Sequence, residues 1–217
     1  MTYLELVNNV LRRLQESTVA SVSENDYSQL IGVYVNQAKE MVENAWVWQS
    51  LKTSYTFNTV AGTAEYDITG LKQKYQPLLM LNLTNRVIVP QKPLSEVLYN
   101  LKMIGASGVP IMYSMSGQNA SGEAQLTLAP IPDAAYNLEF YYYADQAELV
   151  NDTDRLLAPS LPVILAATAM ALEERGEDTG SSPNSLWQQY TNAIGAAVIR
   201  DTEASTDNYD FDAGQLI

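Results

Sequence analysis

The stretch Tyr136-Asn-Leu-Glu-Phe-Tyr-Tyr-Tyr143 decides how the middle of this sequence folds. In a strand its side chains alternate, so Phe140 and Tyr142 face one side while Tyr141 and Tyr143 face the other. Aromatic residues on both faces indicate that both faces are covered, by a second sheet, a helix or another subunit. Burial within the fold and contact with another subunit are therefore two alternatives for Tyr141 and Tyr143.

The sequence around this stretch has the pattern of further strands and turns. Runs of β-branched, aromatic and aliphatic residues alternate with Gly, Pro and Asn, which is typical of antiparallel strands joined by tight turns. One short helix over residues 94–104 interrupts them, because Leu94, Val97, Leu98, Leu101 and Ile104 follow helical spacing. The strands are predicted at residues 53–60, 65–68, 78–83, 86–89, 111–116, 123–129 and 136–144.

Helical patterns precede and follow this β-rich middle. Apolar residues at helical spacing predict helices over residues 3–15 and 27–50, and two more begin near Ser160 and Ser182. Trp46 lies off the main stripe of its helix, which leaves core packing and a subunit contact as alternatives. The third helix is apolar almost all round and includes Leu165 and Met170, so it lies at the centre of a bundle or at an oligomer contact.

This order predicts an α+β fold. We expect residues 1–51 and 152–204 to form a four-helix bundle, with an antiparallel β lobe inserted at residues 52–151. Residues 205–217 form a separate acidic tail, because the periodicity fades after about Ala204.

Composition and charge exclude several function classes. The 217 residues contain no Cys and no His, which excludes disulfides, thiolate or imidazole metal ligands, and Cys or Ser-His-Asp nucleophilic catalysis. The net charge is −13, and residues 151–217 alone hold three basic and eleven acidic side chains. Tight binding to nucleic acid needs clustered Lys or Arg, and no such cluster occurs. The longest apolar run, residues 161–172, is too short to span a bilayer.

Carboxylates are the remaining candidates for chemistry. Glu65 and Glu139 could pair as acid and base in glycoside cleavage, but nothing in the sequence brings them together. Asp152 and Asp154 lack the glycine and the later glutamate of a calcium loop. Glu173 and Glu174 are adjacent on a helix and diverge by about 100°. Solvated or capping side chains are the simpler interpretation, so we expect no catalytic residue, metal or cofactor.

The C-terminal tail has an unusual composition. Four large apolar side chains alternate there with acids, namely Tyr209, Phe211, Leu216 and Ile217. A segment of this kind orders when it docks on a partner, and a frayed end is the alternative.

Several stretches, taken in order, resemble the head-to-tail adaptor proteins of tailed bacteriophages, also called connector or tail tubular A-like proteins. They are residues 35–48, 59–67, 113–117, 126–133, 138–144 and 171–178, which together extend over most of the chain.

The resemblance implies a virion protein of the head-to-tail interface, made in the host cytoplasm, with no enzymatic activity. It implies a ring, dodecameric in this family, that joins the portal protein to the tail tube or nozzle and lets DNA pass without specific binding. The C-terminal segment would then dock in the portal through Tyr209, Phe211, Leu216 and Ile217. Trp46, Tyr141, Tyr143, Leu165 and Met170 would contact neighbouring subunits. The alternatives are a peptidoglycan-degrading, muramidase-type virion hydrolase and another minor tail-completion protein.

Overall fold

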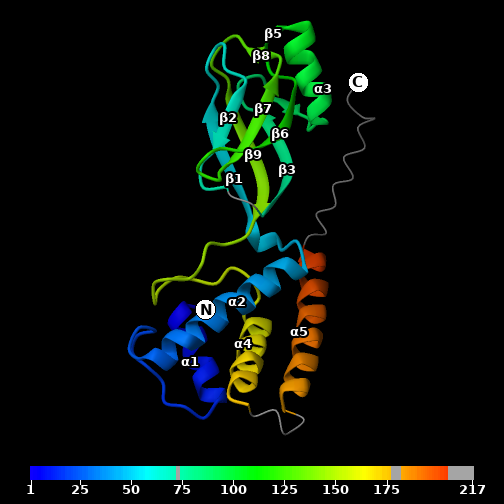
Figure 1. The fold of residues 1–217 in the computed structure, drawn as a ribbon. Helices are drawn as coiled ribbons and strands as arrows, with labels where there is room; N and C mark the ends of the chain where they lie inside the picture. The colour runs from blue at the N-terminus through cyan, green and yellow to red at the C-terminus, as the bar shows by residue number, and fades with distance from the viewer. Residues whose placement is uncertain (72–73, 177–181, 205–217) are drawn as a thin grey trace. The chain divides into compact units, whose positions relative to one another are not determined.

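The computed structural model describes residues 1–71, 74–176 and 182–204. The chain divides into two compact units, each of which is described by itself (Figure 1). The helical unit comprises Met1–Leu51 and Gln146–Ile217, and the β-rich unit comprises Lys52–Asp145.

The helical unit contains four α-helices. They are α1 (Tyr3–Arg13), α2 (Asp26–Ala45), α4 (Ser160–Glu174) and α5 (Ser182–Ala204), and a short 3₁₀ turn, η1 (Gln49–Leu51), follows α2. Side chains satisfy the first amides of α1 and α2, since Thr2 forms a capping box with Glu5 and Asn25 forms one with Ser28.

The core of the helical unit gathers around α4. Every residue from Pro162 to Ala169 is buried, and the small alanines allow α1, α2 and α5 to pack against this helix. In contrast, α5 joins the core only through partly buried side chains, such as Trp187, Tyr190 and Ile194. The helix α5 is therefore an outer layer on α4.

The β-rich unit is built from nine strands in three sheets. A four-stranded sheet has the order β1-β9-β3-β4, a three-stranded sheet the order β2-β7-β6, and β5 pairs with β8 in parallel. The strands are β1 (Lys52–Asn58), β2 (Glu65–Ile68), β3 (Tyr75–Asn82), β4 (Val87–Val89), β5 (Ser107–Gly108), β6 (Met112–Gln118), β7 (Ala124–Ala129), β8 (Ile131–Pro132) and β9 (Asn137–Ala144).

The inner faces of the two larger sheets share one core. Strand β9 lies at the centre of its sheet between β1 and β3, and its Phe140 and Tyr142 are buried. The ring of Tyr113, from the opposite sheet, meets Phe140 edge-on with centroids 5.7 Å apart. The helix α3 (Leu94–Tyr99) continues into a π-helical turn, η2 (Asn100–Ile104), and packs on β6 and β7.

The fold class predicted from the sequence is wrong. Within the described residues there are five α-helices, one of them in the β-rich unit, and nine strands in three sheets, one of them parallel. The β-rich unit is no small lobe, because two sheets close on each other and bury a core of their own. The four helices of the helical unit do not form an even bundle either, because α4 is buried on all sides whereas α5 is buried on one side only. Local patterns located most elements well, but they left a second sheet as only one of three possible covers for the aromatic strand.

Candidate functional site

The exposed apolar surfaces are the first candidates for a functional site. In the β-rich unit, one such surface is the outer face of the four-stranded sheet. The register places Leu79 beside Tyr141 and Leu81 beside both Glu139 and Ile88. These residues alternate with the buried ones, and the Ile88 side chain is 54% exposed. We call Leu79, Leu81, Ile88, Tyr141 and Tyr143 the outer sheet face.

The outer sheet face includes two predicted subunit contacts. Tyr141 and Tyr143 are half-buried, whereas Phe140 and Tyr142 between them point into the core. A hydrogen bond to Glu139 raises the pKa of Tyr141, because ionisation would place a second negative charge beside the carboxylate. The alternation predicted for this strand is confirmed, and the subunit contact of Tyr141 and Tyr143 stays a prediction.

A second apolar surface lies on α3 and η2. The side chains of Tyr99, Met103 and Ile104 are 62%, 75% and 59% exposed, and Leu98 is 36% exposed. Together these four residues form what we call the α3 surface. The helix predicted over residues 94–104 is not regular throughout, because Leu94–Tyr99 is α-helical and Asn100–Ile104 forms a π turn. The π turn, closed by the bond from Gly105 N–H to the Asn100 carbonyl, adds a residue to the last turn and shifts the apolar stripe.

In the helical unit, Trp46 is 41% exposed at the point where α2 ends. Its indole N–H donates to Asp201 on α5, with 3.1 Å between Nε1 and Oδ2. Of the two predicted contacts on α4, Leu165 is buried and Met170 is half-buried in the single chain. No observation tests these three residues as subunit contacts, so that role stays a prediction.

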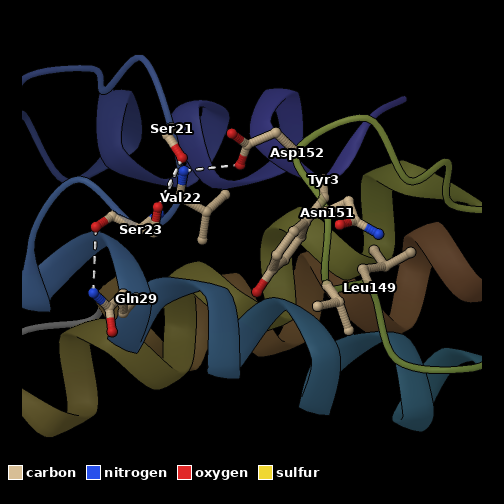
Figure 2. Close-up of a pocket in the computed structure, with 9 residues that line it drawn as sticks. Tyr3, Ser21, Val22, Ser23, Gln29, Leu149, Asn151 and Asp152 are labelled. Carbon is tan, nitrogen blue, oxygen red and sulfur yellow. Dashed lines mark hydrogen bonds between the residues drawn. The ribbon is translucent and has the colours of Figure 1, made fainter.

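The helical unit also has an open hollow of about 490 Å³ between the loop before α2 and the loop after β9 (Figure 2). Asp152 lies at its edge, where a carboxylate oxygen accepts from the Val22 amide at 2.9 Å. Tyr3 lines it from α1, and burial, followed by Glu148 and Asp152, raises the pKa of its hydroxyl. Apart from Tyr3 and Asp152, the lining consists of Ser, Asn and Gln side chains and three aliphatic ones, which provides no nucleophile with a base beside it.

Three of the carboxylates singled out in the sequence accept hydrogen bonds that stabilise the fold. Asp154 accepts from the amides of Val150 and Asn151 at 2.8 and 2.7 Å, and these bonds lower its pKa. Asp152 holds the preceding loop through Val22, and Glu173 accepts from the indole of Trp187 at 2.6 Å. Among the described residues, no group of three or more acidic side chains is placed to hold a metal ion.

Glu65 and Glu139 are not brought together. Glu65 lies on β2 in the three-stranded sheet, where it alternates with Tyr66 and Ile68, the residues that point inward. Glu139 lies on the outside of the four-stranded sheet, between the buried Leu138 and Phe140. The two carboxylates therefore point away from opposite sides of the shared core, and sheets packed in this way are about 10 Å apart. This arrangement does not suit an acid and base pair on one sugar.

The predicted tail residues Tyr209, Phe211, Leu216 and Ile217 lie outside the described residues. In the ranges that the structure describes, no helix is both long and apolar enough to cross a membrane.

Comparison with known proteins identifies the family of the chain. No curated protein matches the chain. The family model of the SU10 adaptor protein matches residues 1–210, which is nearly the whole sequence. The family resemblance inferred from the sequence is thereby confirmed. The chain belongs to the SU10 adaptor protein family, a family of phage head-to-tail adaptors.

Proposed function

We propose that this chain is a structural virion protein that joins the portal to the tail or nozzle and forms a ring around the DNA channel. The family match over residues 1–210 carries this proposal. The exposed apolar surfaces support it, because such surfaces on a folded chain mark contacts with other proteins.

In the proposed ring, copies of the chain associate through the exposed apolar surfaces of the β-rich unit. The outer sheet face, with Tyr141 and Tyr143, and the α3 surface both belong to the β-rich unit, which has six basic and seven acidic residues. The helical unit, with six basic and eighteen acidic residues, has a net charge of −12. Copies of a nearly neutral unit approach one another with less repulsion than copies of a strongly acidic one.

The charge of the helical unit also fits passage of DNA. Phosphates are not neutralised by an acidic surface, so DNA slides past without being held. Residues 205–217 dock in the portal, and their four large apolar side chains, Tyr209, Phe211, Leu216 and Ile217, provide the anchors.

Two experiments test this function. Imaging of intact particles should show a ring of this protein directly beneath the portal, and a position further along the tail would reject the proposal. Sizing of the purified protein with and without purified portal should show a complex only when both are present.

The tail has its own test. Deleting Asp207 to Ile217 should leave the melting temperature unchanged and abolish the portal complex. A point variant, Phe211→Ser, should weaken the complex in the same direction, whereas Gln215→Ser serves as the matched control. Portal binding that survives the deletion would show that another surface docks there.

A further inference from the structure

The chain passes from the helical unit into the β-rich unit through residues 46–51. Trp46 leaves α2 in an extended conformation, Trp48 is buried and donates from its indole to the Val42 carbonyl, and η1 leads to Lys52, the first residue of β1. We call residues 46–51 the first connection.

One carboxylate from the far end of the sequence holds this connection. Asp201, in the last turn of α5, accepts from the Trp46 indole at 3.1 Å. It also accepts from the Gln49 amide, at 3.3 and 3.2 Å to its two oxygens. Hydrogen bonds to a charged acceptor are stronger than neutral ones, so this contact fixes both the side chain and the backbone of the connection.

The chain returns from the β-rich unit to the helical unit at Gln146. Here the backbone is held by a buried lysine and not by a partly exposed carboxylate. Lys39, only 3% exposed, donates to the Gln146 carbonyl and to Glu43. The Gln146 side chain also bonds to the backbone of Arg155 and Leu157. A buried cation and two side-chain bonds hold the chain at Gln146, whereas in the first connection the partly exposed Asp201 carboxylate bonds to the residues on either side of the buried Trp48.

The end of the helix that carries Asp201 lies outside the core. Val198 is the last α5 side chain that packs against the core of the helical unit, and Ile199 after it is 61% exposed, so the last turn can move at a low cost in free energy. Three residues after Asp201 the described chain ends, and residues 205–217 follow directly.

We propose that Asp201 is a positioning residue that couples the end of α5 to the first connection, so that a partner bound to residues 205–217 releases that connection when it displaces the last turn. The coupling through Asp201 does not depend on the proposed portal docking. Only the identification of the partner as the portal rests on it. Its consequence is that docking of the tail segment changes the freedom of the backbone at Gln49, within the first connection.

The coupling is measured on the free full-length protein. Hydrogen exchange of the Gln49 amide, followed by NMR, should become at least tenfold faster in Asp201→Ala, which corresponds to about 1.4 kcal/mol. Asp201→Asn should have a smaller effect, because one oxygen remains to accept. Glu174→Gln removes one exposed carboxylate of the same unit and should leave the rate unchanged. An unchanged rate in Asp201→Ala would refute the positioning role.

Displacement of the helix end is tested without any partner. Glu203→Pro disrupts the last turn of α5 and should accelerate Gln49 exchange as Asp201→Ala does. The double variant should be no faster than either single one, since both remove the same attachment. Additive effects, or no effect of the proline, would overturn the coupling.

Added portal then relates the coupling to assembly. Binding should accelerate Gln49 exchange several-fold in the wild type and leave Asp201→Ala unchanged. Portal that binds without altering the wild-type rate would refute release on docking. Portal that fails to bind would refute the proposed docking instead, and the two variants would still decide the coupling.

Discussion

Replacing Gly32 by alanine should destabilise the helical unit, although alanine is the better helix former. Gly32 lies on α2 against α1, and a Cβ at this position would overlap the hydroxyl oxygen of Tyr3. It would also lie 3.0 Å from Cγ1 of Val22 and 3.1 Å from Cζ of Tyr3. Tyr3 is 6% exposed, so its ring has little room to move aside.

The gain in helix propensity and the cost of overpacking change the free energy of unfolding in opposite directions. The gain in helix propensity is about 1 kcal/mol, and overpacking a buried contact costs about 1–3 kcal/mol. Because three contacts are too close at once, we expect the upper end of that cost and a net loss of about 2 kcal/mol. For a chain of this length the melting temperature should fall by roughly 4–8 °C.

A matched control separates the cost of the close contact with Tyr3 from the gain in helix propensity. Gly195 is on α5, with nothing within 4 Å of the added Cβ, so Gly195→Ala should raise the melting temperature by roughly 2–4 °C. Thermal unfolding followed by helical circular dichroism measures both variants. Tyr3→Phe removes the overlapping oxygen and should recover part of the loss in the double variant. If Gly32→Ala melts at or above the wild type, the reasoning is refuted.

Three other outcomes are expected. Lys39→Met should cost about 3–5 kcal/mol in urea unfolding, because it removes the cation 3.0 Å from buried Glu43, and Lys39→Met with Glu43→Leu should recover most of the loss. Burial raises the pKa of Tyr113 from 10.0 to about 12, so the unfolded chain loses this proton first. The stability of the β-rich unit should therefore be intact below about pH 10 and fall as the pH rises toward about 12, with a shallower fall in Tyr113→Phe; equal slopes would contradict this cause. Met103→Asp should change the free energy of unfolding by less than about 0.5 kcal/mol and weaken self-association seen by light scattering, whereas Val97→Asp, at a buried position of the same helix, should lose roughly 3 kcal/mol or more.

Local pattern was enough to locate most elements of this fold. The alternation of Phe140 and Tyr142 with Tyr141 and Tyr143 predicted a strand with two covered faces, and the inner pair is indeed buried. The helix starting at Ser160 is apolar all round in the sequence and central in the unit, because burial on every side requires that composition.

Features that depend on contacts between residues far apart in the sequence were not predicted. The aromatic strand left a second sheet, a helix or another subunit as possible covers, and its periodicity could not choose among them. The parallel pair β5–β8 and the outer position of α5 likewise depend on which surfaces meet, and no periodicity predicts this. The π turn at Asn100–Ile104 interrupts the helix predicted over residues 94–104, and ideal helical spacing does not predict such a turn. Asp201 bonds to Trp46, 155 positions earlier, and no local pattern predicts a contact of this kind.

The interrupted helical unit has a consequence for how the chain is made. Helices α1 and α2 leave the ribosome before the β-rich unit, but their central partner α4 follows only after all of Lys52–Asp145 has been synthesised. At ordinary rates of translation this delay is roughly 5–20 s. During that time the α1–α2 hairpin exposes the apolar side chains that α4 later covers, while the β-rich segment already has everything it needs to collapse. Nascent chains of this protein should therefore acquire their sheets first and their helical core last.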